Sequence, residues 1–267
     1  MGDLEGSRRN IRAVIPSIFT IGNMGFGFFS ILASGNSNFV MAAWFIILAI
    51  LMDMLDGRIA RLVRGESSFG IEIDSLSDWL SFGIAPAYLI YGFGLKSYGV
   101  WAYPVVFFYV LCGALRLARF NVKAHFRVSE ERKKFFQGLP IPGAAGILAS
   151  FILVYSLIEV QDPARGISWI MNRMPFIYGI LPFLIIFLSL LMISSIPYGA
   201  FKSGSVFKPK SISFLFFVVA AIFFIVAYPQ NSLFLFFFLY VVSGVVMFIF
   251  KSLVSVKSRI YPETKEK

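Results

Sequence analysis

Cysteine and histidine are nearly absent from this chain of 267 residues. It has one cysteine, Cys112, and one histidine, His125. A single cysteine excludes an intrachain disulfide, and it leaves the redox compartment undetermined. Zinc usually takes histidine or cysteine ligands. His125 lies in a basic loop, where a solvated side chain is a simpler interpretation than a metal ligand.

Charged residues are also scarce. They make up 14% of the sequence, whereas 58% is hydrophobic and the mean hydropathy is +0.80. A typical soluble domain is about half apolar and about a quarter charged. The composition therefore predicts a polytopic membrane protein, with no soluble domain, internal repeat or low-complexity tail. We expect no cleavable signal peptide, because the first apolar run is long and lacks a clear small-residue cleavage site.

The apolar runs predict an all-α fold with about eight transmembrane helices, each close to the roughly 20 residues that cross a bilayer. The predicted spans are Val14–Ser34, Phe39–Leu62, Ile71–Phe93, Val100–Leu117, Leu139–Ile158, Phe176–Ile196, Ser211–Tyr228 and Ser232–Phe250. Pro86 is expected to kink the third span, with neighbouring groups bonding to the freed carbonyl.

The positive charges predict the orientation of these spans. With an even number of spans both termini lie on one side, and all but three of the 24 lysines and arginines then fall on that side. The exceptions are Lys96, Arg165 and Arg173. The positive-inside rule makes the crowded side cytoplasmic. The net charge of +10 is explained by topology and attraction to anionic lipid, so no nucleic-acid partner is expected.

Aspartates interrupt the apolar pattern where the second and third spans approach each other. They are Asp53, Asp56, Asp74 and Asp78. Residues three or four apart share one face of a helix, so each of two helices presents a carboxylate pair. Facing each other, the pairs would form an all-oxygen site suited to Mg²⁺ or Mn²⁺. The alternative is that the aspartates are interfacial caps or arginine partners, but intramembrane carboxylates usually mark functional cavities.

Small residues and an arginine accompany the aspartates on the same faces. Gly57, Ala60 and Gly70 would let a bulky ligand approach the backbone. Arg61 would offer a planar fork to phosphate. On the first span, Asn23 and Gly27 lie one turn apart, with Thr20 one turn earlier. These residues either pack helices together, or Asn23 lines a ligand pocket.

The stretch Asp53-x2-Asp56-Gly57-x2-Ala60-Arg61-x8-Gly70-x3-Asp74-x3-Asp78 resembles the complete signature of the CDP-alcohol phosphotransferases. The resemblance implies an integral membrane enzyme that transfers a phospho-alcohol from a CDP-alcohol to a hydroxyl acceptor and releases CMP. It also implies two divalent metal ions on the four aspartates, with Asp78 as the general base. Members of this family often carry Thr and Asn at the positions of Thr20 and Asn23, which favours a nucleotide-binding role for Asn23.

Two further segments are similar to one branch of this family, the bacterial and archaeal phosphatidylserine synthases. They read RLARFN from Arg116 to Asn121 and GLPIP from Gly138 to Pro142. The resemblance implies a CDP-diacylglycerol-type lipid as donor and L-serine as acceptor. The serine-binding candidates are Arg116, Arg119, Asn121 and Gln137. Their alternative role is a topogenic positive flank.

Other acceptors, such as glycerol phosphate or inositol phosphate, and a transporter with an ionisable membrane site remain alternative functions. The sequence divides into a cytoplasmic segment (1–13), a six-helix catalytic core (14–196) and two further helices with a basic cytoplasmic tail (197–267). We expect the protein in the cytoplasmic membrane, surrounded by membrane lipids, with the active site at the cytoplasmic face. The family resemblance implies a homodimer. Ser77 and Ser81 are expected either to donate hydrogen bonds to the carboxylates or to pack the helices.

Overall fold

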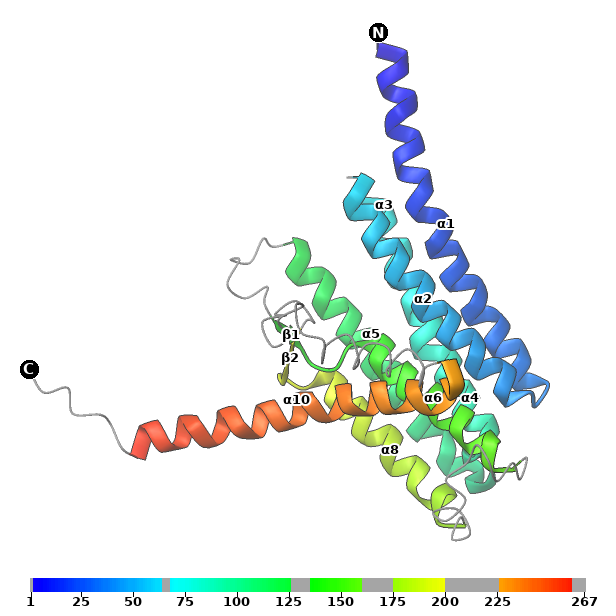
Figure 1. Ribbon diagram of the computed structural model, residues 1–267, viewed down its shortest axis with the longest axis vertical. Helices are drawn as coiled ribbons and strands as arrows, with labels where there is room; N and C mark the ends of the chain where they lie inside the picture. Colours follow the sequence, from blue (N-terminus) through cyan, green and yellow to red (C-terminus); the bar gives the residue numbers. More distant parts are fainter. Residues whose placement is uncertain (1, 64–67, 126–134, 160–174, 200–225, 261–267) are drawn as a thin grey trace, which may run out of the picture.

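The computed structural model describes residues 2–63, 68–125, 135–159, 175–199 and 226–260. Helix α1 (Gly2–Gly35) and helix α2 (Phe39–Val63) pack along each other as an antiparallel pair. Asn38 caps the start of α2, because its side-chain oxygen accepts a hydrogen bond from the Met41 amide at 3.2 Å. This short connection places the polar C-terminal half of α2 beside the N-terminal part of α1 (Figure 1).

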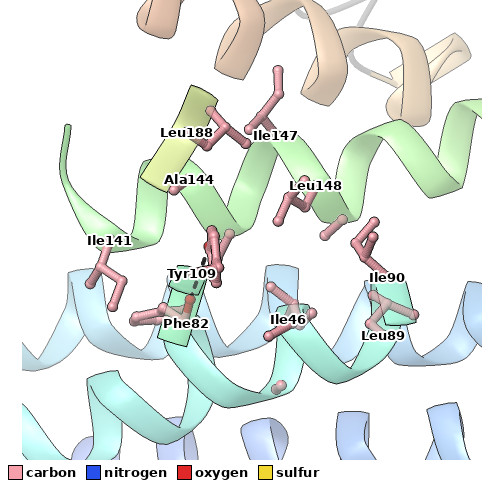
Figure 2. Close-up of a cluster of buried hydrophobic side chains, with 14 of the residues drawn as sticks. Ile46, Phe82, Leu89, Ile90, Tyr109, Ile141, Ala144, Ile147, Leu148 and Leu188 are labelled. Atoms are coloured by element: carbon pink, nitrogen blue, oxygen red, sulfur yellow. Dashed lines mark hydrogen bonds between the residues drawn. The ribbon is translucent and has the colours of Figure 1, made fainter. Parts of the chain in front are cut away.

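The third predicted span is helical but not uniform. It consists of α3 (Ser68–Asp78), the π-helical segment η1 (Trp79–Ile84) and α4 (Ala85–Phe93). Pro86 lies in the first turn of α4 and has no N–H to give to the carbonyl of Phe82, four residues earlier. The buried hydroxyl of Tyr109 donates to that carbonyl instead, at 3.2 Å (Figure 2). A neighbouring donor to the freed carbonyl is thus present as expected, and the irregular part of this span is the π-helical segment before Pro86.

The remaining described helices follow this segment in the chain. They are η2 (Leu95–Trp101), α5 (Ala102–His125), α6 (Ile141–Glu159), α8 (Pro175–Ile193) and α10 (Pro229–Ile260). Helix α5 packs against α8, and α6 lies between α2 and α10. In Figure 1, α10 runs across the other helices instead of alongside α1.

A short β-pair departs from the predicted all-α fold. Strand β1 (Phe135–Gln137) pairs antiparallel with β2 (Pro197–Gly199), and Phe136 lies opposite Tyr198. Gly138 follows β1 with φ +84°, a left-handed conformation that favours glycine. The fold is therefore helical with one two-stranded ribbon among the described residues, and the ribbon joins the connection before α6 to the one after α8.

The core lies where α2, η1, α4, α5 and α6 meet. Ile46, Phe82, Leu89 and Leu148 are fully buried there (Figure 2). Large apolar side chains elsewhere point outward, among them Phe107 and Phe183, which are 64% and 73% exposed. Exposed apolar surface on this scale is typical of a membrane interface.

Four helices are long and apolar enough to cross a membrane, judged by length and composition over the described residues. They contain the segments Ile18–Gly35, Phe39–Ile59, Leu95–Val122 and Pro229–Ile249. Two shorter apolar segments are Ile141–Leu157 and Gly179–Ile193. Every other predicted span coincides with a helix, but most of the predicted span Ser211–Tyr228 lies outside the described residues.

Candidate active site

Three of the four aspartates converge. Asp53 comes from α2, and Asp74 and Asp78 come from α3. Each offers a carboxylate oxygen, and these oxygens lie within 4.8 Å of one another on half-buried side chains. The two helices thus present their carboxylates to each other, as the spacing predicts.

The fourth aspartate is held by α1. Asp56 is only 6% exposed, and its carboxylate accepts a hydrogen bond from the hydroxyl of Thr20. It adjoins the cluster of three without being part of it. Thr20 was absent from the predicted site residues, although it lies one turn before Asn23 on the same helix.

Asn23 is the second contact from α1. Its side chain is fully buried, and its amide donates to Oδ1 of Asp78 at 3.1 Å. The side-chain oxygen of Asn23 is buried and has no hydrogen-bond partner among the described residues. A buried acceptor without a donor is costly in a folded protein, so this atom has unused capacity for a ligand or cation beside Asp78.

Two serines bring α1 close to the carboxylate-bearing helix. Ser77 donates to the Thr20 carbonyl at 3.1 Å, and Ser81 donates to the Asn23 carbonyl at 2.9 Å. At Gly27 an added Cβ would lie 2.7 Å from Ser81 Cα, so only glycine allows this approach. Ser77 and Ser81 thus bond to the α1 backbone, and in the structure their hydroxyls do not reach the carboxylates as donors.

The donor set fits a hard divalent cation. It consists of three clustered carboxylates, a fourth carboxylate nearby and an unpaired amide oxygen. Oxygen ligands of this kind are those that Mg²⁺ and Mn²⁺ prefer. Arg116 on α5 supplies positive charge that acts on Asp53 and Asp78. One guanidinium cannot balance the charge of this cluster, which leaves it suited to a cation.

The small residues predicted to line the ligand site differ in how exposed they are. Gly57 is exposed, and a Cβ added there would meet no atom within 4 Å. Gly70 is half-buried. Ala60 and Arg61 belong to α2, but their side chains lie outside the described residues. The backbone at Gly57 is therefore exposed, and the role of the small residues in ligand binding stays a prediction.

The predicted serine-binding residues separate into different environments. Arg119 donates to the carbonyls of Ile193 at 3.0 Å and Ser194 at 3.4 Å, at the C-terminal end of α8. Asn121 donates to Ser75 at 2.9 Å. Gln137 lies in β1, and its side chain is outside the described residues. Arg116 alone of these candidates is known to be buried, being 8% exposed, and it lies on the side of the carboxylates.

Tyr240 on α10 was not singled out from the sequence, and it packs between β2 and α6. Its ring lies 5.7 Å from that of Tyr198 and against the backbone of α6, where a Cβ at Gly143 would be 3.0 Å away. The available signal was a tyrosine in a phenylalanine-rich apolar helix, since a buried tyrosine hydroxyl usually has a polar partner.

Residues 13–186 match the family described as CDP-alcohol phosphatidyltransferase. The chain is 31% identical over 241 residues to the CDP-diacylglycerol–serine O-phosphatidyltransferase of Helicobacter pylori, covering 89% of this chain and 92% of that protein. It is 35% identical over 204 residues to the protein of that name in Methanocaldococcus jannaschii, covering 76% and 82%. It is 36% identical over 188 residues to the archaetidylserine synthase of Methanothermobacter thermautotrophicus, covering 69% of each.

Proposed function

Because this chain belongs to the CDP-alcohol phosphatidyltransferase family, we propose that it transfers the phosphatidyl group of CDP-diacylglycerol, or of an archaeal equivalent, to L-serine. The products are phosphatidylserine and CMP, and the reaction belongs to phospholipid biosynthesis. One observation carries the proposal. Asp53, Asp74 and Asp78 converge within 4.8 Å in a chain that aligns along most of its length with serine transferases.

The aspartate cluster supports a metal-dependent reaction. Asp53, Asp56, Asp74 and Asp78 would hold two divalent ions, Mg²⁺ or Mn²⁺. Bound there, such ions would neutralise charge on the attacking and leaving oxygens of a phosphoryl transfer. The orphan oxygen of Asn23 and the net negative charge of the cluster support this occupancy.

The reaction itself is one substitution at phosphorus. The serine hydroxyl oxygen bonds to the phosphorus that carries the lipid, and the bond from that phosphorus to the CMP oxygen breaks. Asp78 accepts the hydroxyl proton as general base, with Asn23 fixing the orientation of its carboxylate. Positioning of the two substrates supplies much of the rate.

The donor lies along the C-terminal half of α2. Gly57, Ala60 and Gly70 give it close access to the backbone, and Arg61 pairs with the diphosphate. Asn23 completes the nucleotide side of the site. The open space at Gly57 and the burial of Asn23 beside Asp78 support this arrangement.

The acceptor site takes a carboxylate in this proposal, not a phosphate. Serine needs one bidentate arginine fork, whereas glycerol phosphate or inositol phosphate carries nearly two negative charges and would need several cations. Arg116 provides the fork beside Asp78, while the described contacts direct Arg119 to the carbonyls ending α8 and Asn121 to Ser75. Gln137 would close the site from β1.

We place the enzyme in the cytoplasmic membrane with eight spans, both termini inside and the active site at the cytoplasmic face. The distribution of lysine and arginine supports this topology. Residues 14–196 form the catalytic core, and residues 197–267 add two helices and a basic tail. The family resemblance favours a homodimer.

The test is release of CMP from CDP-diacylglycerol by purified protein. We expect release on addition of L-serine, but not of glycerol phosphate or inositol phosphate. EDTA should abolish it and Mg²⁺ or Mn²⁺ restore it. Asp53→Ala and Asp74→Ala should each be inactive while still eluting as folded protein. Full activity in chelator would contradict the metal assignment, and use of glycerol phosphate in place of serine would contradict the acceptor.

A further inference from the structure

The side chain of Asn121 joins the end of α5 to the helix that carries two of the aspartates. Its Nδ2 donates to the hydroxyl of Ser75 on α3 at 2.9 Å, and this hydroxyl in turn donates to the Ile71 carbonyl of its own helix at 3.0 Å. Both side chains are half-buried. Ser75 directly follows Asp74 and lies three residues before Asp78, so this chain of hydrogen bonds meets α3 at the level of its carboxylates.

The contact also has a defined direction around the axis of α3. A helix turns by about 100° per residue, so Asp74 and Asp78 share one face and are about 40° apart. From the middle of that face, Ser75 lies about 80° to one side and Ser77 about 80° to the other. Ser77 donates to the Thr20 carbonyl of α1 at 3.1 Å. The carboxylate face of α3 is therefore flanked by two hydrogen bonds, one to α1 and one to α5.

The end of α5 is itself anchored. Arg119 lies two residues before Asn121 on this helix. Its guanidinium donates to the carbonyls of Ile193 at 3.0 Å and Ser194 at 3.4 Å, where α8 ends. Cationic side chains suit the last carbonyls of a helix, which carry partial negative charge. Because this end of α5 is tied to α8, Asn121 holds Ser75 from a fixed position.

We propose that Asn121 is a positioning residue of the metal site, acting through Ser75. Its hydrogen bond fixes the rotation of α3 that turns Asp74 and Asp78 toward Asp53. The carboxylate oxygens of the three then lie within 4.8 Å of one another, close enough to share a cation. Groups that hold metal ligands in place commonly set the affinity for the metal. This role rests on the metal-dependent transfer proposed above, and it replaces the predicted contact of Asn121 with serine.

The experiment measures Mn²⁺ binding by purified full-length protein in detergent, without substrates. Free Mn²⁺ is followed by its electron paramagnetic resonance signal, which weakens as the ion binds. For Asn121→Ala and for Ser75→Ala we expect the affinity for Mn²⁺ to fall about tenfold, the lower end of the effect of such partners. At saturating Mn²⁺ the KM for serine should be unchanged. A side chain that binds serine would instead raise this KM and leave Mn²⁺ affinity as in the wild type.

Two comparisons separate positioning from general support of the fold. Ser189→Ala is the matched control, because the buried Ser189 hydroxyl donates to the Ile185 carbonyl of its own helix at 2.7 Å. That helix, α8, carries none of the four aspartates, so this variant should keep wild-type Mn²⁺ affinity even if its thermal midpoint falls. In the double variant of Asn121 and Ser75 the loss should not exceed the larger single loss, because both changes remove one contact.

Three outcomes would contradict the positioning role. They are wild-type Mn²⁺ affinity in folded Asn121→Ala, losses that multiply in the double variant, and an equal loss of Mn²⁺ affinity in Ser189→Ala. Wild-type protein that binds no Mn²⁺ would instead overturn the metal site of the proposed function, and the positioning role with it.

Discussion

At the scale of single residues, the aspartates differ in what surrounds them. Asp78 receives a hydrogen bond from Asn23, Asp56 receives one from Thr20, and Asp53 and Asp74 face the other carboxylates. A carboxylate with one oxygen already fixed by an amide is oriented before any ligand arrives. Asp78 is therefore the best candidate for proton transfer, while its neighbours suit metal binding.

Asp78→Asn tests this division of roles. Asparagine keeps the shape and can still accept from Asn23 through its oxygen, but it cannot take the serine proton. Turnover should fall at least about a hundredfold, the usual contribution of a general base, with CMP binding reduced much less. The measurement pairs kcat with equilibrium binding of CMP. Equal losses in both would move Asp78 from the base role to that of a metal ligand.

Gly57→Leu tests the open face of α2. Because a Cβ there meets no protein atom within 4 Å, the substitution should not disturb packing. Replacing glycine in a helix favours folding by up to about 1 kcal/mol. We expect CMP affinity to fall at least about tenfold because leucine fills the ligand space.

The matched control for Gly57 is Gly179 on α8, where an added Cβ also meets nothing within 4 Å. Helix α8 contributes none of the four aspartates, so Gly179→Leu should leave CMP affinity unchanged. Normal CMP binding by Gly57→Leu, measured by calorimetry in detergent, would show that the open space at Gly57 is not part of the nucleotide site.

Residue spacing predicts which side chains share a helix face, and this was enough to predict that the aspartates meet. It does not predict partners that come from another element. Arg119 lies one turn from Arg116 in sequence, but its contacts are with carbonyls of Ile193 and Ser194, more than seventy residues away. Ser77 and Ser81 bond to the α1 backbone for the same reason, since only the packed helices determine which acceptor is nearest.

At the scale of elements, the segment η1 places a π-helical turn directly after Asp78. Such turns often occur at functional sites. Here the turn lies between the carboxylate-bearing α3 and the core helix α4, and Pro86 follows it. The Tyr109 hydroxyl is the donor that makes the freed Phe82 carbonyl tolerable in an apolar environment.

Tyr109→Phe should therefore destabilise the protein. The ring stays in its buried position, but the Phe82 carbonyl loses this donor, at a cost of about 1–3 kcal/mol. We expect a lower midpoint of thermal unfolding in detergent, with residual activity. Tyr88→Phe is the control, because Tyr88 lies on α4 with an exposed side chain and should unfold like the wild type. An unchanged midpoint for Tyr109→Phe would show that another group stabilises the carbonyl.

The long helices were predictable because their apolar runs are continuous, but two elements were not. The strands β1 and β2 are three residues each, too short for an alternating pattern. The π-helical segment η1 is held to α5 by the hydrogen bond from Tyr109 to the Phe82 carbonyl. Both elements arise from contacts between segments far apart in sequence, and hydropathy does not report such contacts.

At the scale of the whole molecule, the charge distribution sets a topology that labelling can test. Only Lys96, Arg165 and Arg173 fall on the predicted outer side. Asn36 lies in the connection between the first and second predicted spans, and Lys96 lies in the connection between the third and fourth. Both residues are exposed, and both connections are on the predicted outer side. The native Cys112 is fully buried, so the wild-type protein gives a low labelling background.

We therefore expect a membrane-impermeant thiol reagent, added to intact cells, to label Asn36→Cys and Lys96→Cys. Lys208→Cys and Lys265→Cys should be labelled only after the cells are opened, because eight spans keep the basic segments and both termini inside. Lys208 tests the loop before the seventh predicted span, and Lys265 tests the span count as a whole. Labelling of Lys265→Cys but not Lys208→Cys in intact cells would mean an odd number of spans after the catalytic core. Labelling of Lys208→Cys would place the last basic loop outside and contradict the cytoplasmic face of the site.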